Sequence, residues 1–268
     1  MKQRVGFLFT GQARSNPLSF NQNHNYAILE SFTNNIFTNE FKEKFDYDIF
    51  ISTDDIHLQK TFDYFGIDHV KNIHILEPIF GGQEFYLKDV NYKLQRVNYY
   101  LNMYSQQNFM DCESYPGSIL QNYKVLDAFH LLEQNRSNYD FIIRIRLDVI
   151  FIRNIMDCFN KFSENPDLHI IGQHDFFFIG KPLIMKFYCT SLDRKYGKYN
   201  FNITNHVFKA NVIDYETYNN NFKKQNYKRW TYAPEIQVWE TLFEFCSINN
   251  LDIDKTINGI HIVDYIPH

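Results

Sequence analysis

Residues 139–151 read YDFIIRIRLDVIF and contain the strongest strand pattern of the sequence. Side chains of a β-strand point alternately to its two faces. Every second residue from Phe141 onward is apolar, which predicts one wholly apolar face. The opposite face carries two arginines and a carboxylate, which are Arg144, Arg146 and Asp148. We therefore expect residues 140–152 to form a single strand that packs one face in a core and presents charged side chains on the other.

The three charged side chains form a row that is typical of a binding site. Same-face neighbours in a strand are about 6.6 Å apart, so Arg144, Arg146 and Asp148 lie within reach of one phosphate-sized ligand or a metal–diphosphate. A charged row flanked by isoleucines is partly buried and then requires partners, which favours a functional role. The alternative is a solvated face on which Arg146 and Asp148 form a surface ion pair.

Apolar runs alternate with helical periods on both sides of this stretch. This alternation is typical of an α/β domain whose sheet is flanked by helices. The predicted strands are residues 5–9, 47–53, 73–76 and one or two within 169–179. The predicted helices are residues 26–37, residues 118–134, where Ser118 and Gln121 have the spacing of a capping box, and one that starts at Pro234.

The whole chain has 268 residues and 32.3 kDa, enough to bury a large core without disulfides. Its formal charge of -4 argues against a nucleic-acid partner. The four cysteines show no CxxC spacing, which fits neither a zinc ribbon nor a disulfide framework. Apolar stretches are too short for a signal peptide or a membrane span, so we expect a cytoplasmic protein.

Two other strand ends hold candidate ligand-binding residues. The turn after the first strand contains Thr10, Gly11, Gln12 and Arg14. A glycine there lets backbone N–H groups approach a ligand closely, although an ordinary tight turn is the alternative. The second strand ends at Thr53, Asp54 and Asp55, whose carboxylates fit either a ligand site or the N-cap of a helix.

Three motifs in combination resemble a class of GT-A-fold glycosyltransferases found in bacterial surface-polysaccharide loci and in large DNA viruses. The motifs are Gly-Gln-x-Arg at 11–14, Asp-Ile-Phe-Ile-Ser-Thr at 48–53 and Tyr-Asp-x-x-x-Arg-x-Arg-x-Asp-Val at 139–149. The resemblance spans about the first two thirds of the chain. It implies a GT-A-like (Rossmann-like) α/β fold with a mixed, mostly parallel sheet. It further implies a single domain, in which residues 1–155 bind a nucleotide-diphosphate sugar and residues 156–268 serve a glycan or glycoconjugate acceptor.

The same resemblance assigns roles to individual residues. It implies that residues 10–14 contact the nucleotide, and that Gln121 and Lys124 match donor-contacting positions, although the capping box already accounts for Gln121. In such enzymes an Asp-x-Asp motif holds Mn²⁺ or Mg²⁺ against the diphosphate, and here Arg146 replaces the first Asp while Asp148 remains. Arginine then supplies part of the neutralising charge. His261 matches a late histidine that completes the metal site in several of these enzymes; its alternative is an ordinary strand histidine.

Inverting sugar transfer needs a carboxylate base for the acceptor hydroxyl, and the candidates are Asp175 and Glu235. Asp175 lies beside an apolar run, which predicts a raised pKa. Glu235 follows Pro234 at a helix start, where a glutamate also stabilises the helix dipole.

Two other functions fit less of the sequence. A nucleotidyltransferase shares the need for a metal–phosphate site, but the turn at 10–14 is a poor phosphate loop. A non-catalytic nucleotide- or glycan-binding module is favoured by the missing first Asp.

Overall fold

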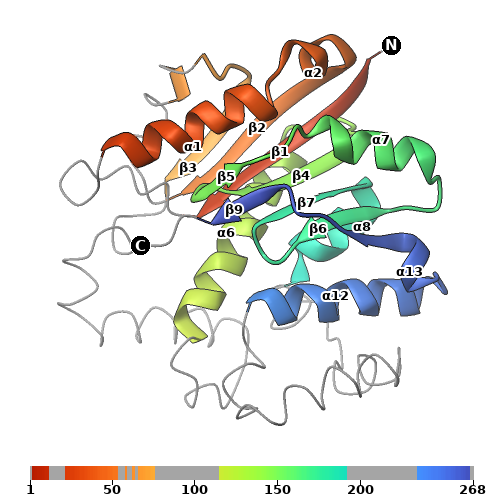
Figure 1. Cartoon of the computed structure of the whole chain (residues 1–268). Coiled ribbons are helices and arrows are strands. Elements are labelled where there is room, and N and C mark those ends of the chain that lie inside the picture. The colour runs from red at the N-terminus through yellow and green to blue at the C-terminus, as the bar shows by residue number, and fades with distance from the viewer. Residues whose placement is uncertain are drawn as a thin grey trace.

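The computed structural model describes residues 2–11, 22–53, 58, 62–63, 66–75, 115–191 and 234–265. Within them, seven strands form one sheet in the order β3-β2-β1-β4-β7-β6-β8 (Figure 1). The strands are β1 (Gln3–Gly11), β2 (Phe45–Thr53), β3 (Val70–Ile75), β4 (Phe141–Arg146), β6 (Ile170–Gln173), β7 (Phe177–Gly180) and β8 (Ile257–Gly259). β7 is antiparallel to both of its neighbours and every other neighbouring pair is parallel, so the predicted mixed, mostly parallel sheet is confirmed.

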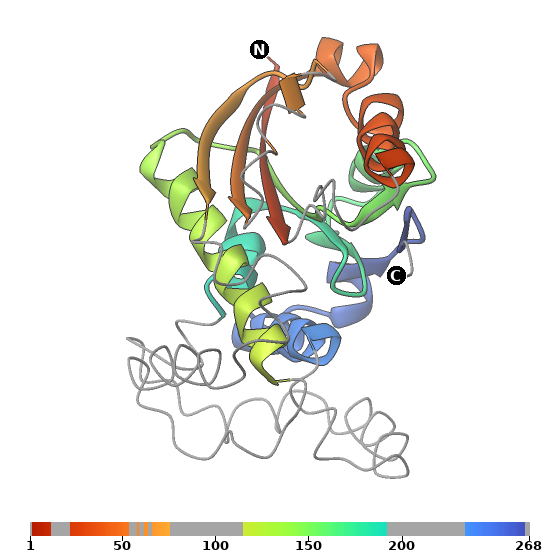
Figure 2. The same cartoon turned by 90° about the vertical axis from the view of Figure 1, so that its left-hand side faces the viewer.

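Helices cover both faces of the sheet (Figure 2). One face packs against α1 (Gln22–Asn35), α2 (Asn39–Lys44) and α7 (Met156–Glu164). The other packs against α6 (Tyr115–Gln134), α8 (Pro182–Cys189) and α12 (Pro234–Ile248), and the short helix α13 (Ile253–Thr256) precedes β8. None of the helices in the described ranges combines the length and apolar character that a bilayer span requires.

Alternation along each central strand explains these two cores. Along β1, Phe7 and Phe9 face α1 and α2, whereas Leu8 faces α6. The first core is rich in phenylalanine, and Phe7 contacts the rings of Phe37 and Phe41. Many of the chain's phenylalanines therefore fill the interior.

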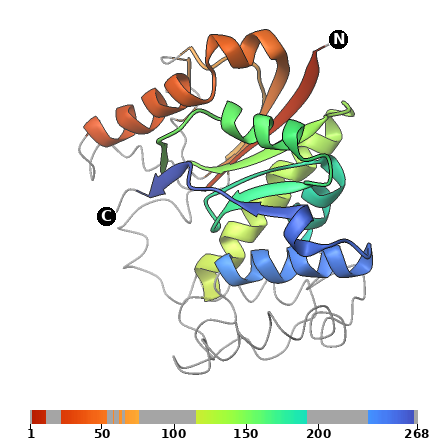
Figure 3. The ribbon, with the colours of Figure 1, turned by 45° about the vertical axis from the view of Figure 1, so that its right-hand side comes forward.

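The predicted single strand 140–152 is wrong in its length. β4 ends at Arg146, residues 147–148 form a turn, and β5 (Val149–Phe151) pairs with β9 (Val263–Tyr265) in a separate two-stranded sheet (Figures 1 and 3). β1 pairs with β4 only as far as Thr10 opposite Arg146, and after the turn the chain pairs with β9 instead. The predicted apolar face is nevertheless confirmed, because the alternate residues from Phe141 to Phe151 all lie in the first core.

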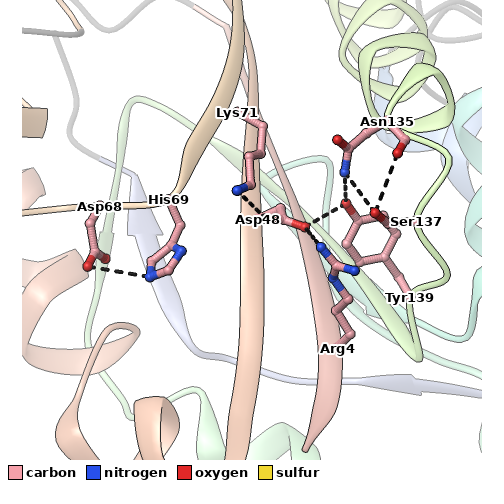
Figure 4. A network of polar contacts seen from close by, with 8 residues as sticks. All are labelled: Arg4, Asp48, Asp68, His69, Lys71, Asn135, Ser137 and Tyr139. Atoms are coloured by element: carbon pink, nitrogen blue, oxygen red, sulfur yellow. Dashed lines mark hydrogen bonds and ion pairs between the residues drawn. The ribbon is translucent and has the colours of Figure 1, made fainter.

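Asp48 is a buried carboxylate whose contacts join neighbouring strands of the sheet (Figure 4). It lies away from the carboxyl ends of these strands. Its Oδ2 atom accepts hydrogen bonds from Arg4 at 2.6 Å and from the Tyr139 hydroxyl at 2.9 Å. Lys71 Nζ lies 3.4 Å from Oδ1, and Asn135 donates to the Tyr139 hydroxyl. The carboxylate thus joins β1, β2 and β3 to the segment that enters β4.

Replacing Asp48 by alanine is expected to lower the free energy of unfolding by about 1–3 kcal/mol. The cost arises mainly at Tyr139, whose buried hydroxyl loses its acceptor, since Arg4 and Lys71 are partly exposed and can be hydrated. Urea unfolding measures the change. Asp46→Ala is the control, because Asp46 is exposed on the same strand and is expected to change stability by less than about 0.5 kcal/mol. Equal losses in both variants would contradict this role.

Candidate functional site

Several of the sequence-predicted residues meet where the connections of the sheet diverge. From β1 the chain proceeds through α1 to β2 on one side, and it returns through α6 to β4 on the other side of β1. Open α/β sheets bind ligands beyond the carboxyl ends of strands at such a switch point. Gly11 ends β1 and Arg146 ends β4, and the Leu147 amide donates to the Thr10 carbonyl at 3.0 Å.

Arg144 lies wholly inside the protein. Its side chain is 0% exposed, on the face of β4 that packs against α6. Its Nε donates to the Thr10 hydroxyl at 3.2 Å, and its Nη1 donates to the backbone carbonyl of Asp175. Its Nη2 has no hydrogen-bond partner in the described part of the chain. In this structure the Arg144 guanidinium therefore lies beneath the surface, where its hydrogen bonds hold Thr10 and the backbone of Asp175 in place.

Arg146 is the arginine at the rim, and two carboxylates hold it. Nε and Nη2 donate to the two oxygens of Asp148 at 2.9 and 2.6 Å, and Nη1 meets Asp175 at 2.8 Å. The guanidinium also lies over the Phe176 ring. Burial by itself lowers the pKa of Arg146, but the bonds and charges of Asp148 and Asp175 outweigh burial and raise it. The pair of Arg146 and Asp148 is largely buried, unlike the solvated ion pair that was the alternative.

Asp175 occupies the turn between β6 and β7, next to His174 at a φ of 48°. The carboxylate is 1% exposed, and its Oδ2 accepts from Arg146 and Gln121. Burial raises the pKa of Asp175, but the charges of Arg146 and Arg144 and the Gln121 bond prevail and hold it below its ordinary value. The predicted raised pKa is therefore wrong: the apolar residues adjacent in sequence matter less than arginines contributed by another strand.

Helix α6 supplies a polar stripe above the strand ends. The helix begins at Tyr115, so Ser118 lies inside it and the predicted capping box is wrong. Gln121 instead donates to Asp175. Lys124 is buried at 5% exposure, and Asp127 follows at the same spacing of three along the helix. Gln121 thus meets the turn between β6 and β7, and Asp127 meets β2 and β3.

Sequence reasoning missed Ser52, Asp127 and His74. Ser52 is opposite Thr10 on one side and His74 on the other, so the three strand residues form one row across β1, β2 and β3. The Ser52 hydroxyl donates to Asp127 at 2.6 Å, and His74 Nδ1 lies 2.8 and 2.9 Å from the two oxygens of Asp127. The available signal was the spacing of three that runs from Gln121 through Lys124 to Asp127.

The two predicted metal ligands lie apart. Both oxygens of Asp148 accept hydrogen bonds from Arg146, whereas His261 Nε2 lies 2.8 Å from Asp264 beside β9. β5 and β9 are antiparallel, and their pairing places His261 near the far end of β5 from Asp148. No group of three or more His, Cys, Asp or Glu in the described ranges is placed to hold an ion. In this arrangement Asp148 and His261 are not placed to bind one ion together, and the predicted cation stays a prediction.

The remaining predicted residues divide between described and undescribed positions. The Thr53 hydroxyl donates to the Gly11 carbonyl at 3.0 Å, which joins the ends of β1 and β2. Gly11 has a φ of 107°, a conformation that favours glycine, as the predicted turn requires. Glu235 lies in the first turn of α12, but its side chain is outside the described atoms. Outside the described residues lie Gln12, Arg14, Asp54 and Asp55.

Comparisons with known proteins reveal a distant likeness in three dimensions. No family model matches the sequence, and no curated protein matches it. A solved structure of mouse xyloside xylosyltransferase 1 in its apo form superposes with a TM-score of 0.39 and 10% sequence identity. The match covers 97% of this chain and 85% of that one. A likeness of this degree does not fix an activity.

Proposed function

We propose that this chain is a glycosyltransferase that transfers a sugar from a nucleotide-diphosphate sugar to a glycan or glycoconjugate acceptor. The observation that carries the proposal is the position of Arg146 and Asp148. They lie at the carboxyl end of β4, beside the end of β1, at the switch point of the sheet. The motif that resembles GT-A glycosyltransferases places the same residues at the donor diphosphate.

Arg146 is the residue proposed to meet the diphosphate. Its guanidinium can form two parallel hydrogen bonds to phosphate oxygens, as it now does to Asp148. The side chain is 17% exposed, so it reaches the surface without large rearrangement. An incoming diphosphate competes with the carboxylates of Asp148 and Asp175 for the guanidinium.

Arg144 and Asp175 have a supporting role in this proposal. Asp175 links Arg144, Arg146 and Gln121, and thereby joins β4, the β6–β7 turn and α6. A carboxylate with a lowered pKa and two cationic neighbours is a weak proton acceptor. We therefore assign Asp175 to positioning Arg146, and Glu235 stays a predicted base.

A non-catalytic nucleotide-binding module is the second candidate. It is favoured by the missing first Asp of the metal-binding motif, in whose place Arg146 stands. Such a module would bind nucleotide diphosphates but transfer no sugar.

Differential binding of nucleotides tests the proposal. UDP or GDP is expected to raise the melting temperature more than UMP or GMP at equal concentration, because the second phosphate contacts Arg146. A ligand present at 100 times its Kd adds about 2.7 kcal/mol of stability. Transfer is then measured with UDP-glucose, UDP-galactose, UDP-N-acetylglucosamine and GDP-mannose on an array of glycans. Parallel titrations with Mn²⁺ and with EDTA test the predicted cation.

The outcomes separate the two candidates. Diphosphate-selective binding with transfer supports a glycosyltransferase, and the same binding without transfer from any donor supports the binding module. Equal shifts for mono- and diphosphates, or no shift at all, would contradict a diphosphate site.

A further inference from the structure

His74 is an imidazole oriented by a carboxylate at the carboxyl end of β3. Both contacts to Asp127 are made by Nδ1, at 2.8 and 2.9 Å. Nε2 makes no hydrogen bond or ion pair with a described residue, and the side chain is 48% exposed. Asp127 is itself held by the Ser52 hydroxyl, and Ser52 is 0% exposed.

This geometry selects one protonation form of the neutral ring. A carboxylate accepts hydrogen bonds, so it holds the proton of His74 on Nδ1 and leaves the lone pair on Nε2. An imidazole fixed in this way by an aspartate is the arrangement that general-base catalysis uses. The carboxylate then stabilises the ring when Nε2 takes up a proton.

The place of His74 in the sheet relates it to the proposed diphosphate site. Thr10 is opposite Ser52 and Arg146, and Ser52 is opposite His74, so one row crosses four parallel strands. Neighbouring strands are about 4.8 Å apart, which separates the Cα atoms of His74 and Arg146 by about 14 Å. The two partly exposed groups thus lie on either side of the ends of β1 and β2, at the carboxyl edge of the sheet.

We infer that His74, in place of the predicted Glu235, is the general base that deprotonates the acceptor hydroxyl, with Asp127 and Ser52 as its positioning residues. The inference rests on the proposed function. The hydroxyl proton moves to Nε2 as the hydroxyl oxygen forms a bond to the anomeric carbon. The bond from that carbon to the diphosphate oxygen breaks, and its electron pair leaves with the diphosphate. The reaction inverts the anomeric configuration, and the imidazolium returns its proton to water.

The groups around His74 are consistent with this assignment. From α6 it faces Asp127, with Lys124 one turn earlier on the helix, and from β2 it faces the uncharged Ser52. Lys71, the lysine of β3, is directed to Asp48.

The first test determines by NMR which nitrogen of the His74 ring carries the proton. Nitrogen chemical shifts of ¹⁵N-histidine-labelled full-length protein, measured at a pH where the ring is neutral, are expected to show His74 with its proton on Nδ1. Asp127→Asn is expected to abolish this preference. A proton found on Nε2 in the unsubstituted protein would overturn the inference, whatever the outcome of transfer assays.

The second test is kinetic and has a matched control. His69 is also next to an aspartate, with Nε2 3.5 Å from Asp68, but it precedes β3 at the opposite end of the sheet (Figure 4). His74→Asn is expected to lower the transfer rate by about 10²- to 10⁴-fold and to flatten the acidic limb of its pH profile, with UDP binding unchanged. His69→Asn, which suits the φ of 63° there, is expected to change neither.

The outcomes distinguish this inference from the proposed function. Normal transfer by His74→Asn, or a product of retained configuration, overturns the base and leaves the glycosyltransferase in place. Absence of UDP and GDP binding in the unsubstituted protein overturns the proposed function, and the base role with it.

Discussion

Replacement of Asp175 by alanine is expected to lower the free energy of unfolding by about 3–5 kcal/mol, the range for breaking a buried ion pair from one side. The carboxylate is 1% exposed and lies 2.8 Å from Arg146, while its backbone carbonyl accepts from Arg144. Alanine leaves two largely buried cations without the anion they share. Urea unfolding at neutral pH measures the loss. Asp167→Ala, at an exposed position just before β6, is the control and is expected to cost less than about 0.5 kcal/mol.

The stability that Asp175 contributes is also expected to depend on pH. The pKa of Asp175 is lower in the folded protein than its ordinary value of 3.8, because the arginine charges and the Gln121 bond outweigh burial. A carboxyl group of this kind contributes stability that is fully present above the unfolded pKa and is lost as the pH falls through the folded pKa. Below about pH 4 the unsubstituted protein is expected to lose stability more steeply than Asp175→Asn. Parallel losses in the two proteins would contradict the assignment.

Substitution of Arg146 by lysine is expected to weaken UDP binding by about 10- to 100-fold. Lysine keeps the charge but cannot form two parallel hydrogen bonds, and bonds to charged groups contribute about 1.5–3 kcal/mol each. Isothermal titration with UDP and UMP measures the effect, which should be larger for the diphosphate. Lysine also preserves a cation between Asp148 and Asp175, so the fold is expected to tolerate the change.

Two other arginines provide controls for this experiment. Arg153 is exposed just after β5, so Arg153→Lys is expected to bind UDP like the unsubstituted protein. Arg144→Lys is expected to reduce stability without ligand, because Arg144 is 0% exposed and packs inside the protein. Weakened binding in Arg153→Lys, or unchanged binding in Arg146→Lys, would contradict a role for Arg146 at the diphosphate.

Periodicity predicted the parts of this protein that depend on local patterns. The alternation in residues 141–151 identified the buried face, because a strand face is fixed by the backbone alone. The second strand was likewise predicted to end at Thr53, and β2 ends there.

The features that the sequence could not reveal depend on contacts between segments that are far apart in the chain. The strand break after Arg146 coincides with the change of pairing from β1 to β9, and the direction of the Asp175 pKa depends on arginines from β4. Gln121 matched a local capping pattern but bonds to a residue 54 positions away. Asp127 meets Ser52 across 75 positions, a separation at which no spacing rule applies.

The pairing of β1 with β4 has a consequence for how the protein forms during synthesis. The Arg4 amide meets the Asp140 carboxylate across 136 positions, and β8 completes the main sheet only at residues 257–259. Contacts between such distant segments slow folding, because loop closure must precede them. On a ribosome, β1 and β2 emerge early with unpaired edges, and the switch point cannot assemble until β4 follows. We therefore expect nascent chains of about 140 residues to depend on chaperones more than the finished protein does.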